Sequence, residues 1–207
     1  QKNDGTQTIL EGNPVEELKK YYSNFEVRTD GADIPFCGGL FGSLGYDYIR
    51  YIEELPDENS DEIGIETIQF MLALSFMVLD HVAETLTAIV LEEDSEAGKA
   101  VGLKKAEELI QRAVTNMVIR EDRFEQDGVI IKKSDTLDQY SEKVEKIKHY
   151  IREGHIFQTV LSQRWTIETK QTGFDLYRQL RVLNPSPYLY YFNFGEFEII
   201  GSSPEML

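Results

Sequence analysis

A helical pattern gives way directly to a strand pattern between residues 136 and 169, and this change of period limits the fold more than any other feature. Apolar residues first recur at steps of three and four, at Leu137, Tyr140, Val144, Ile147 and Ile151. Thr136 and Gln139 have the spacing of a capping box, and Gly154 is placed to end the helix. Residues 155–169 then alternate between two faces, which predicts a β-strand.

The two faces of this predicted strand differ in chemistry. One face carries the apolar side chains of Phe157, Leu161, Trp165 and Ile167. The other face carries Gln158, Ser162 and Arg164 together with Val160. This polar face fits either an antiparallel sheet with one side in solvent or a strand that lines a polar cavity, and periodicity leaves both open.

Further elements are predicted on both sides of this region. Helices are expected at 13–25, 96–118 and 173–183. Strands are expected in the glycine-punctuated run 34–56, twice within 69–92 around a turn at Asp80–His81, and as a pair at the end of the chain. A buried helix is the alternative for the first part of 69–92. Helices beside antiparallel hairpins predict an α+β fold, with antiparallel sheets and packed helices.

The polar stretch 119–133 predicts a junction between two regions, at 1–128 and 134–207. A chain of 207 residues is long enough for two such regions or for one large domain.

The charge of the chain excludes several classes of partner. With 37 acidic and 21 basic residues, the formal net charge is −16, which argues against nucleic-acid binding and against adhesion to an anionic membrane. Cys37 is the single cysteine, so an internal disulfide framework and a cysteine metal site are excluded and a reducing, cytoplasmic location is expected. The longest apolar stretch, near 70–79, is too short to span a bilayer.

Two short motifs near the end of the chain have both structural and functional interpretations. "NPSPYLYY" (184–191) reads as a proline-restricted turn followed by packing tyrosines. "GSSPEML" (201–207) places Glu205 after a small-residue turn, either as a surface residue or at the edge of a site.

Taken together, four stretches resemble the chorismate-utilising enzymes, and within them most closely the large subunit (component I) of anthranilate synthase. They are "FCGGLFGSLGYDYIRYIEELP", "IREGHIFQTVLSQRW", "LRVLNPSPYLYYF" and "EIIGSSPEML". They occur in the order that this family shows and cover the chain from about residue 34 to its end. The resemblance implies part of the two-lobed fold of that subunit.

The resemblance also implies a reaction, a carbon–oxygen lyase step in tryptophan biosynthesis. Chorismate and ammonia would give an aminodeoxyisochorismate, which loses pyruvate to leave anthranilate. A glutaminase subunit would supply the ammonia, and Mg²⁺ would hold the substrate carboxylate. Glu205 maps onto the general acid that helps the ring hydroxyl leave, in a role that needs a pKa raised by partial burial. Gly201, Ser202 and Ser203 map onto the substrate-binding turn.

Gln158 narrows the implied chemistry to the addition of an amine. The relatives that add water carry a lysine at this position as a base, and a glutamine cannot take that role. Ammonia needs no such base because it is already a nucleophile. Anthranilate synthase and aminodeoxychorismate synthase both remain compatible with Gln158.

The NPSPYL segment favours anthranilate synthase, because in that family it forms part of the feedback site for L-tryptophan. The matching residues here are Asn184, Pro185, Ser186, Pro187, Tyr188 and Leu189. The Leu-Leu-Glu-Ser motif that forms the other part of that site is absent from this sequence. A non-catalytic tryptophan-binding or interaction module that reuses this fold is a further alternative.

The family's later motifs, including its magnesium-binding glutamates, are also absent and would follow residue 207. We therefore expect a fragment that has no metal ligands of its own and is inactive alone. Its apolar edges are expected to favour self-association.

Overall fold

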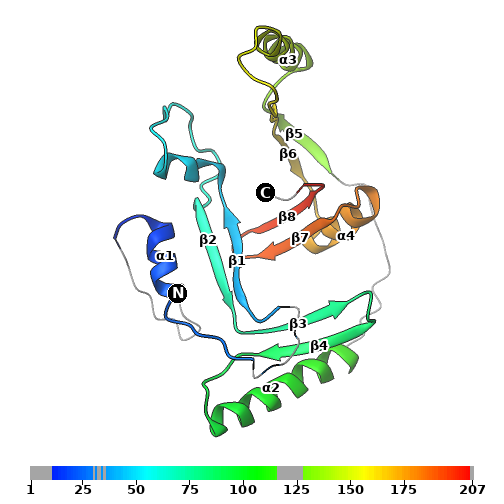
Figure 1. Cartoon of the computed structure of the whole chain (residues 1–207). Coiled ribbons are helices and arrows are strands. Elements are labelled where there is room, and N and C mark those ends of the chain that lie inside the picture. The colour runs from blue at the N-terminus through cyan, green and yellow to red at the C-terminus, as the bar shows by residue number, and fades with distance from the viewer. Residues whose placement is uncertain (1–10, 30, 32–33, 35, 116–127, 206–207) are drawn as a thin grey trace. The chain divides into compact units, whose positions relative to one another are not determined.

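The computed structural model describes residues 11–29, 31, 34, 36–115 and 128–205 (Figure 1). The chain divides into two compact units, Gln1–Arg120 and Glu121–Leu207. The predicted junction at 119–133 lies outside the described residues over 119–127, and its last part forms strand β5 (Val129–Lys133).

The first unit begins with helix α1 (Pro14–Tyr22), which is shorter than the predicted 13–25. The Asn13 side chain caps the helix, because its Oδ1 accepts hydrogen bonds from the N–H groups of Val15 at 3.0 Å and Glu16 at 3.4 Å. Pro14 occupies the first turn, where a missing N–H costs nothing.

Two antiparallel hairpins follow in the first unit. Strand β1 (Gly39–Leu44) pairs with β2 (Ile68–Ala73), and β3 (Ser75–Asp80) pairs with β4 (Thr85–Val90). The two strands predicted around Asp80–His81 are confirmed as β3 and β4, but the stretch 69–92 also holds most of a third strand, β2, because Leu74 separates β2 from β3. Within 34–56 the strand stops at Leu44, and Tyr46–Tyr51 forms a 3₁₀ helix (η1).

Helix α2 (Glu96–Thr115) packs on β4 and β3, as Figure 1 shows. The predicted helix at 96–118 is confirmed over its described residues. Ile89, on β4, is the one buried apolar residue among those that the structure describes, with 7% of its surface exposed.

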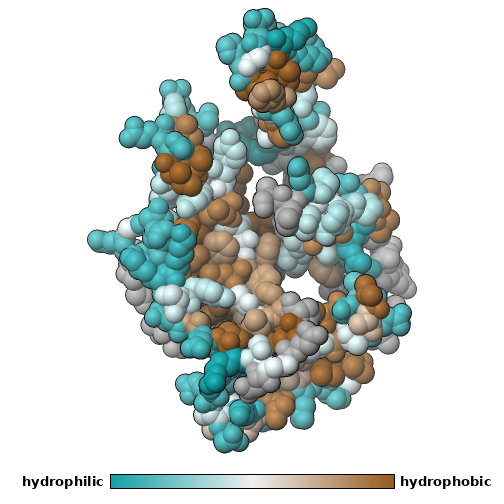
Figure 2. Space-filling model, in the orientation of Figure 1, coloured by the Kyte–Doolittle hydropathy of each residue, from teal (hydrophilic) through white to brown (hydrophobic). Residues whose placement is uncertain are grey.

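In the second unit, helix α3 (Leu137–Arg152) confirms the predicted capping box. Thr136 Oγ1 accepts from the Gln139 N–H at 3.3 Å, and Gln139 Oε1 accepts from the Thr136 N–H at 2.9 Å. Gly154 follows the helix with φ = +79°, a left-handed conformation that glycine adopts without strain. Part of the apolar stripe on α3 lies at the surface, as Figure 2 shows, with Leu137 80% exposed.

The predicted strand at 155–169 was largely wrong. Only Trp165–Glu168 forms a strand, β6, which pairs with β5. Residues 156–164 have no regular hydrogen-bonded structure apart from a bend at Phe157, whose side chain is fully exposed. A strand needs a neighbouring strand for its hydrogen bonds, and β5 offers only five residues. The alternating residues upstream of Trp165 therefore have no strand to pair with among the described residues.

The unit ends with helix α4 (Gly173–Leu183) and a hairpin of β7 (Tyr188–Asn193) and β8 (Glu198–Ser203). Both the helix at 173–183 and the final strand pair were predicted and are confirmed. The α+β fold, with antiparallel sheets beside helices, is thus confirmed. No helix in the described part of the chain combines the length and apolar character that a membrane span needs.

Candidate active site

The β7–β8 hairpin brings together most of the residues that the sequence singles out. Its register pairs Tyr188 with Ser203, Leu189 with Ser202 and Tyr190 with Gly201. Residues directly opposite each other in an antiparallel pair share a face of the sheet. The end of the NPSPYL segment therefore lies beside Gly201–Ser203, the last residues of β8.

A hydrogen bond also joins the start of the NPSPYL segment to the same end of β8. Ser202 Oγ donates to the main-chain oxygen of Asn184 at 2.7 Å. Asn184 caps the C-terminus of α4, and its N–H donates to the Leu180 oxygen at 2.9 Å. Within the segment, Ser186 Oγ donates to the Tyr188 oxygen at 3.2 Å. Both ends of 184–189 are thus tied to β8.

Gly201 is required to be a glycine by its partner on β7. A Cβ on this residue would overlap the ring and hydroxyl of Tyr190, which lie across it. An aromatic ring that covers a bare glycine in the opposite strand fixes the register of the hairpin.

Glu205 lies just beyond β8 and is exposed in this structure. Its main chain is held by Ser203, whose hydroxyl donates to the Glu205 oxygen at 2.8 Å and accepts from the Glu205 N–H at 3.4 Å. This local turn fixes where the Glu205 side chain leaves the backbone. The following residues, 206 and 207, lie outside the described part of the chain.

Gln158 is not brought to the hairpin by any contact among the described residues. It lies in the irregular segment before β6, and its side chain is exposed. The idea that Gln158 and Ser162 share the polar face of one strand fails with the strand itself. The proposed role of Gln158 therefore rests on the resemblance and not on a position in this sheet.

A carboxylate that sequence reasoning did not single out lies under α4. Glu198 Oε1 accepts hydrogen bonds from the Tyr191 hydroxyl and, at 3.2 Å, from Asn193 Nδ2. The bond to Glu198, followed by burial, raises the pKa of Tyr191 above its ordinary value. A Cβ on Gly173 would overlap Glu198 Oε2, so the first turn of α4 approaches the carboxylate closely.

The side chains around Glu198 form a cluster that holds helix α4 on the β7–β8 hairpin. The rings of Phe174 and Tyr177 pack on Tyr191 with centroid distances of 5.4 and 5.9 Å. Helix α4 is therefore held on the hairpin at its start by this cluster and at its end by the Ser202–Asn184 bond. The pairing of Glu198 with Asn193 follows from the strand register, which is a non-local property, and only the turn at 194–197 signals it in the sequence.

The described residues do not offer a ligand set for magnesium. Among them, no group of three or more His, Cys, Asp and Glu side chains could hold a metal ion. The Mg²⁺ implied by the resemblance therefore does not fit the described part of the chain.

A family model described as chorismate binding enzyme matches residues 1–207, and the chain belongs to this family. Within it, the chain is 37% identical over 99% of its length to anthranilate synthase component 1 of Acetivibrio thermocellus. The proteins of the same name from Pseudomonas putida and Cereibacter sphaeroides are 37% and 36% identical over 99% and 96% of the chain.

A solved structure agrees with these relatives. The crystal structure of anthranilate synthase component I from Streptococcus pneumoniae TIGR4 matches with a TM-score of 0.70 and 34% identity over 91% of this chain. The chain spans 43% of that structure, and 43%, 43% and 41% of the three relatives. It therefore spans about two fifths of the length of the proteins it matches.

Proposed function

We propose that this chain forms part of an anthranilate synthase component I, which converts chorismate and ammonia to anthranilate and pyruvate. The observation that carries the proposal is the 37% identity to such a subunit over 99% of the chain. The hairpin supports it, because the two motifs of the implied substrate and feedback sites lie on paired strands.

In this reaction Glu205 acts as the general acid. The ring hydroxyl of chorismate is a poor leaving group, and a proton from the Glu205 carboxyl lets it depart as water while the ammonia nitrogen forms its bond to the ring. Pyruvate is eliminated in the second stage. Glu205 is exposed in this structure, so the shielding of this acid from water must come from bound substrate or from a covering element.

Ser203 positions this acid, and Gly201 accommodates the Tyr190 ring that packs across it. The Ser203 hydroxyl holds the Glu205 main chain at both its N–H and its oxygen. Gly201–Ser203, at the end of β8, would lie along the substrate. By the family resemblance, Gln158 stands where the water-adding relatives carry a basic lysine, and its amide cannot act as that base, which favours ammonia as the nucleophile.

The segment Asn184–Leu189 would form one wall of a feedback site for L-tryptophan in the same subunit. Its support is the match of Asn184, Pro185, Ser186, Pro187, Tyr188 and Leu189 to the family motif, together with its two attachments to β8. A glutaminase subunit as the source of ammonia, Mg²⁺ as cofactor and a cytoplasmic location belong to the same proposal.

The test replaces the matching segment of the Streptococcus pneumoniae component I with this chain. We expect the chimaera, checked for folding by circular dichroism, to form fluorescent anthranilate from chorismate, ammonium and Mg²⁺. The 207-residue chain alone is expected to form none, because it spans two fifths of the matched subunits. A folded chimaera that makes aminodeoxychorismate, or no product, would refute the assignment.

Glu205→Gln in the active chimaera tests the role of the acid. We expect kcat to fall by about 10²- to 10⁴-fold, the usual contribution of a general acid, with little change in the KM for chorismate. Glu196→Gln, in the hairpin turn, is the matched control and should leave kcat unchanged. A raised KM at normal kcat would show that Glu205 binds substrate and does not donate the proton.

A further inference from the structure

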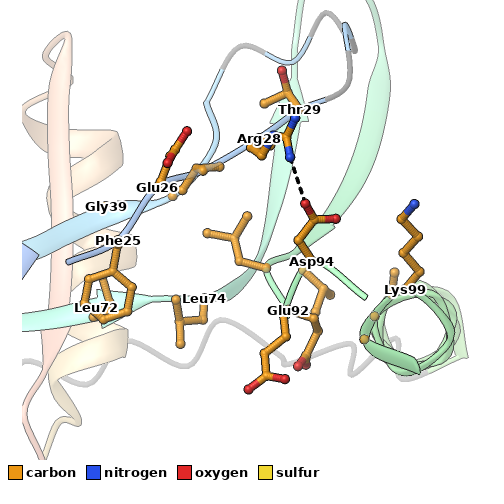
Figure 3. Close-up of a pocket in the computed structure, with 18 of the residues that line it drawn as sticks. Phe25, Glu26, Arg28, Thr29, Gly39, Leu72, Leu74, Glu92, Asp94 and Lys99 are labelled. Atoms are coloured by element: carbon orange, nitrogen blue, oxygen red, sulfur yellow. Dashed lines mark hydrogen bonds and ion pairs between the residues drawn. The ribbon is translucent and has the colours of Figure 1, made fainter. Parts of the chain in front are cut away.

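A pocket of about 930 Å³ lies within the first unit (Figure 3). It is bounded by residues 24–29, the start of β1, the end of β2, strand β4 with the loop after it, and helix α2. Its volume is within the range of about 300–1,000 Å³ that is usual for small-molecule sites. None of its lining residues is among those assigned above to chorismate or tryptophan.

The walls of the pocket are apolar. Phe25, Leu72 and Leu74 line one part, as Figure 3 shows, and Leu91 and Leu103 also line it. An apolar lining of this kind takes the body of a ligand out of water and leaves the choice between ligands to the few charged groups at the rim.

Gly102 keeps part of this volume open. It lies inside α2, and a Cβ there would make only ordinary contacts, with Glu92 Cγ at 3.5 Å. The fold therefore does not require glycine at 102, although glycine in a helix interior costs about 1 kcal/mol relative to alanine. Gly98, one turn earlier, differs because its Cβ would overlap the Glu93 carbonyl oxygen. A residue that weakens its helix without a local need is a signal of function.

The rim has more negative than positive charge. Arg28 is neutralised by Asp94, with Arg28 Nη1 and Asp94 Oδ2 3.0 Å apart across the mouth (Figure 3). Lys99 pairs with Glu96, which lies outside the lining, at 3.5 Å.

Two carboxylates at the rim are left over. The side chains of Glu26 and Glu93 make no ion pair with any residue that the structure describes. Glu92, also in the lining, is neutralised by an ion pair with Lys105. The uncompensated charge of the pocket is therefore negative.

We propose that this pocket binds a small apolar molecule that carries one positive charge, such as an aromatic or aliphatic ammonium. Its apolar body would lie against Leu72 and Leu74, and its ammonium group would lie at the rim, in the field of the Glu26 and Glu93 carboxylates. The net charge of −16 adds a long-range attraction for cations. The same field repels carboxylates, so the pocket is not a second site for chorismate, and its function is independent of the proposed reaction.

The test is an NMR titration of the ¹⁵N-labelled 207-residue chain with three probes that share a phenyl body. They are 2-phenylethylammonium, the neutral 2-phenylethanol and the anionic 3-phenylpropionate. We expect saturable shifts in residues 24–28, 88–94 and 98–106 with the ammonium. Its Kd should be about threefold lower than that of the alcohol, the effect of partly exposed charges, and the carboxylate should bind most weakly.

Two variants separate the pocket from nonspecific binding. Gly102→Leu fills the open volume and should abolish the saturable shifts, while the better helix propensity of leucine maintains or raises the Tm. The double variant Glu26→Gln/Glu93→Gln changes two surface residues. It should bind the ammonium and the alcohol with about equal Kd values. Equal affinities for the three probes, no saturation with the ammonium, or binding that persists in folded Gly102→Leu would each overturn the proposal.

Discussion

The hydroxyl of Ser202 donates a hydrogen bond of 2.7 Å to the main-chain oxygen of Asn184. This bond ties the end of α4 to β8, the strand that carries the candidate substrate-binding residues Gly201–Ser203. The register of β7 and β8 adds a second tie, because Leu189 lies opposite Ser202. A displacement of the 184–189 segment must therefore either move residues 201–203 of β8 or break these bonds. The geometry provides a direct connection between the two proposed ligand sites.

Removal of this hydrogen bond should loosen the 184–189 segment. We expect Ser202→Ala to lower the free energy of unfolding by about 1 kcal/mol, the usual net value of one hydrogen bond, as measured by urea denaturation. Amide exchange at Ser186 and Leu189 should accelerate. Ser202→Thr retains the hydroxyl and serves as the control. Equal exchange rates in the Ala and Thr variants would show that the bond does not restrain the segment.

Local signals in the sequence were sufficient for most helices. The capping box at Thr136 and Gln139 and the glycine at 154 act within a few residues, so the bounds of α3 could be predicted from neighbours alone. The prediction of a strand at 155–169 was wrong because strand formation does not depend on local signals alone. Its pattern was periodic, but a strand also needs a partner, and β5 reaches only Trp165–Glu168.

In the candidate site, too, contiguous motifs could be predicted from the sequence and non-local contacts could not. The motifs themselves, Asn184–Leu189 and Gly201–Glu205, could be found in the sequence because each is contiguous. Their contact through Ser202 and the Glu198–Tyr191 bond under α4 could not, since both depend on strand register and helix packing. Sequence spacing placed Gln158 on a strand face that the structure does not form.

Gly201 offers a test of the hairpin register. We expect Gly201→Ala to destabilise the chain by about 1–3 kcal/mol, the usual cost of overpacking, because the added methyl overlaps the Tyr190 ring. Tyr190→Ala in the same chain should recover part of the loss. The measurement is the urea midpoint of each variant.

Gly102→Ala is the matched control for the change at Gly201, since its methyl makes only ordinary contacts and the helix gains propensity. It should leave stability unchanged or higher. A Gly201→Ala variant as stable as this control would mean that Tyr190 does not lie over residue 201.

The turn between β3 and β4 should weaken in acid. The N–H groups of Ala83 and Val82 donate to Asp80 Oδ1 at 2.9 and 2.8 Å and hold the pKa of this carboxyl below its ordinary value of 3.8. A lowered folded pKa contributes stability that is present above 3.8 and is lost as the pH falls through the folded value.

Asp80→Asn tests this contribution, because the amide oxygen can still accept both hydrogen bonds but does not titrate. The wild-type chain should be more stable than the variant at neutral pH, and the difference should shrink as the pH falls below 3.8. Urea midpoints across this range measure it. A difference that stays constant with pH would mean that the charge on Asp80 does not contribute.

The opposite pH dependence is expected at Tyr191, whose hydrogen bond to Glu198 raises its pKa above the ordinary 10.0. The neutral phenol is favoured in the fold, so this contribution is complete below pH 10.0 and is lost as the pH rises through the folded pKa. Tyr191→Phe cannot titrate, and its stability should fall less than that of the wild type between about pH 9 and about pH 11.

Tyr177→Phe is the control, because Tyr177 packs on Tyr191 without a bond to Glu198. If both variants follow the wild-type pH profile, the Tyr191–Glu198 bond does not contribute a pH-dependent stability to the hairpin.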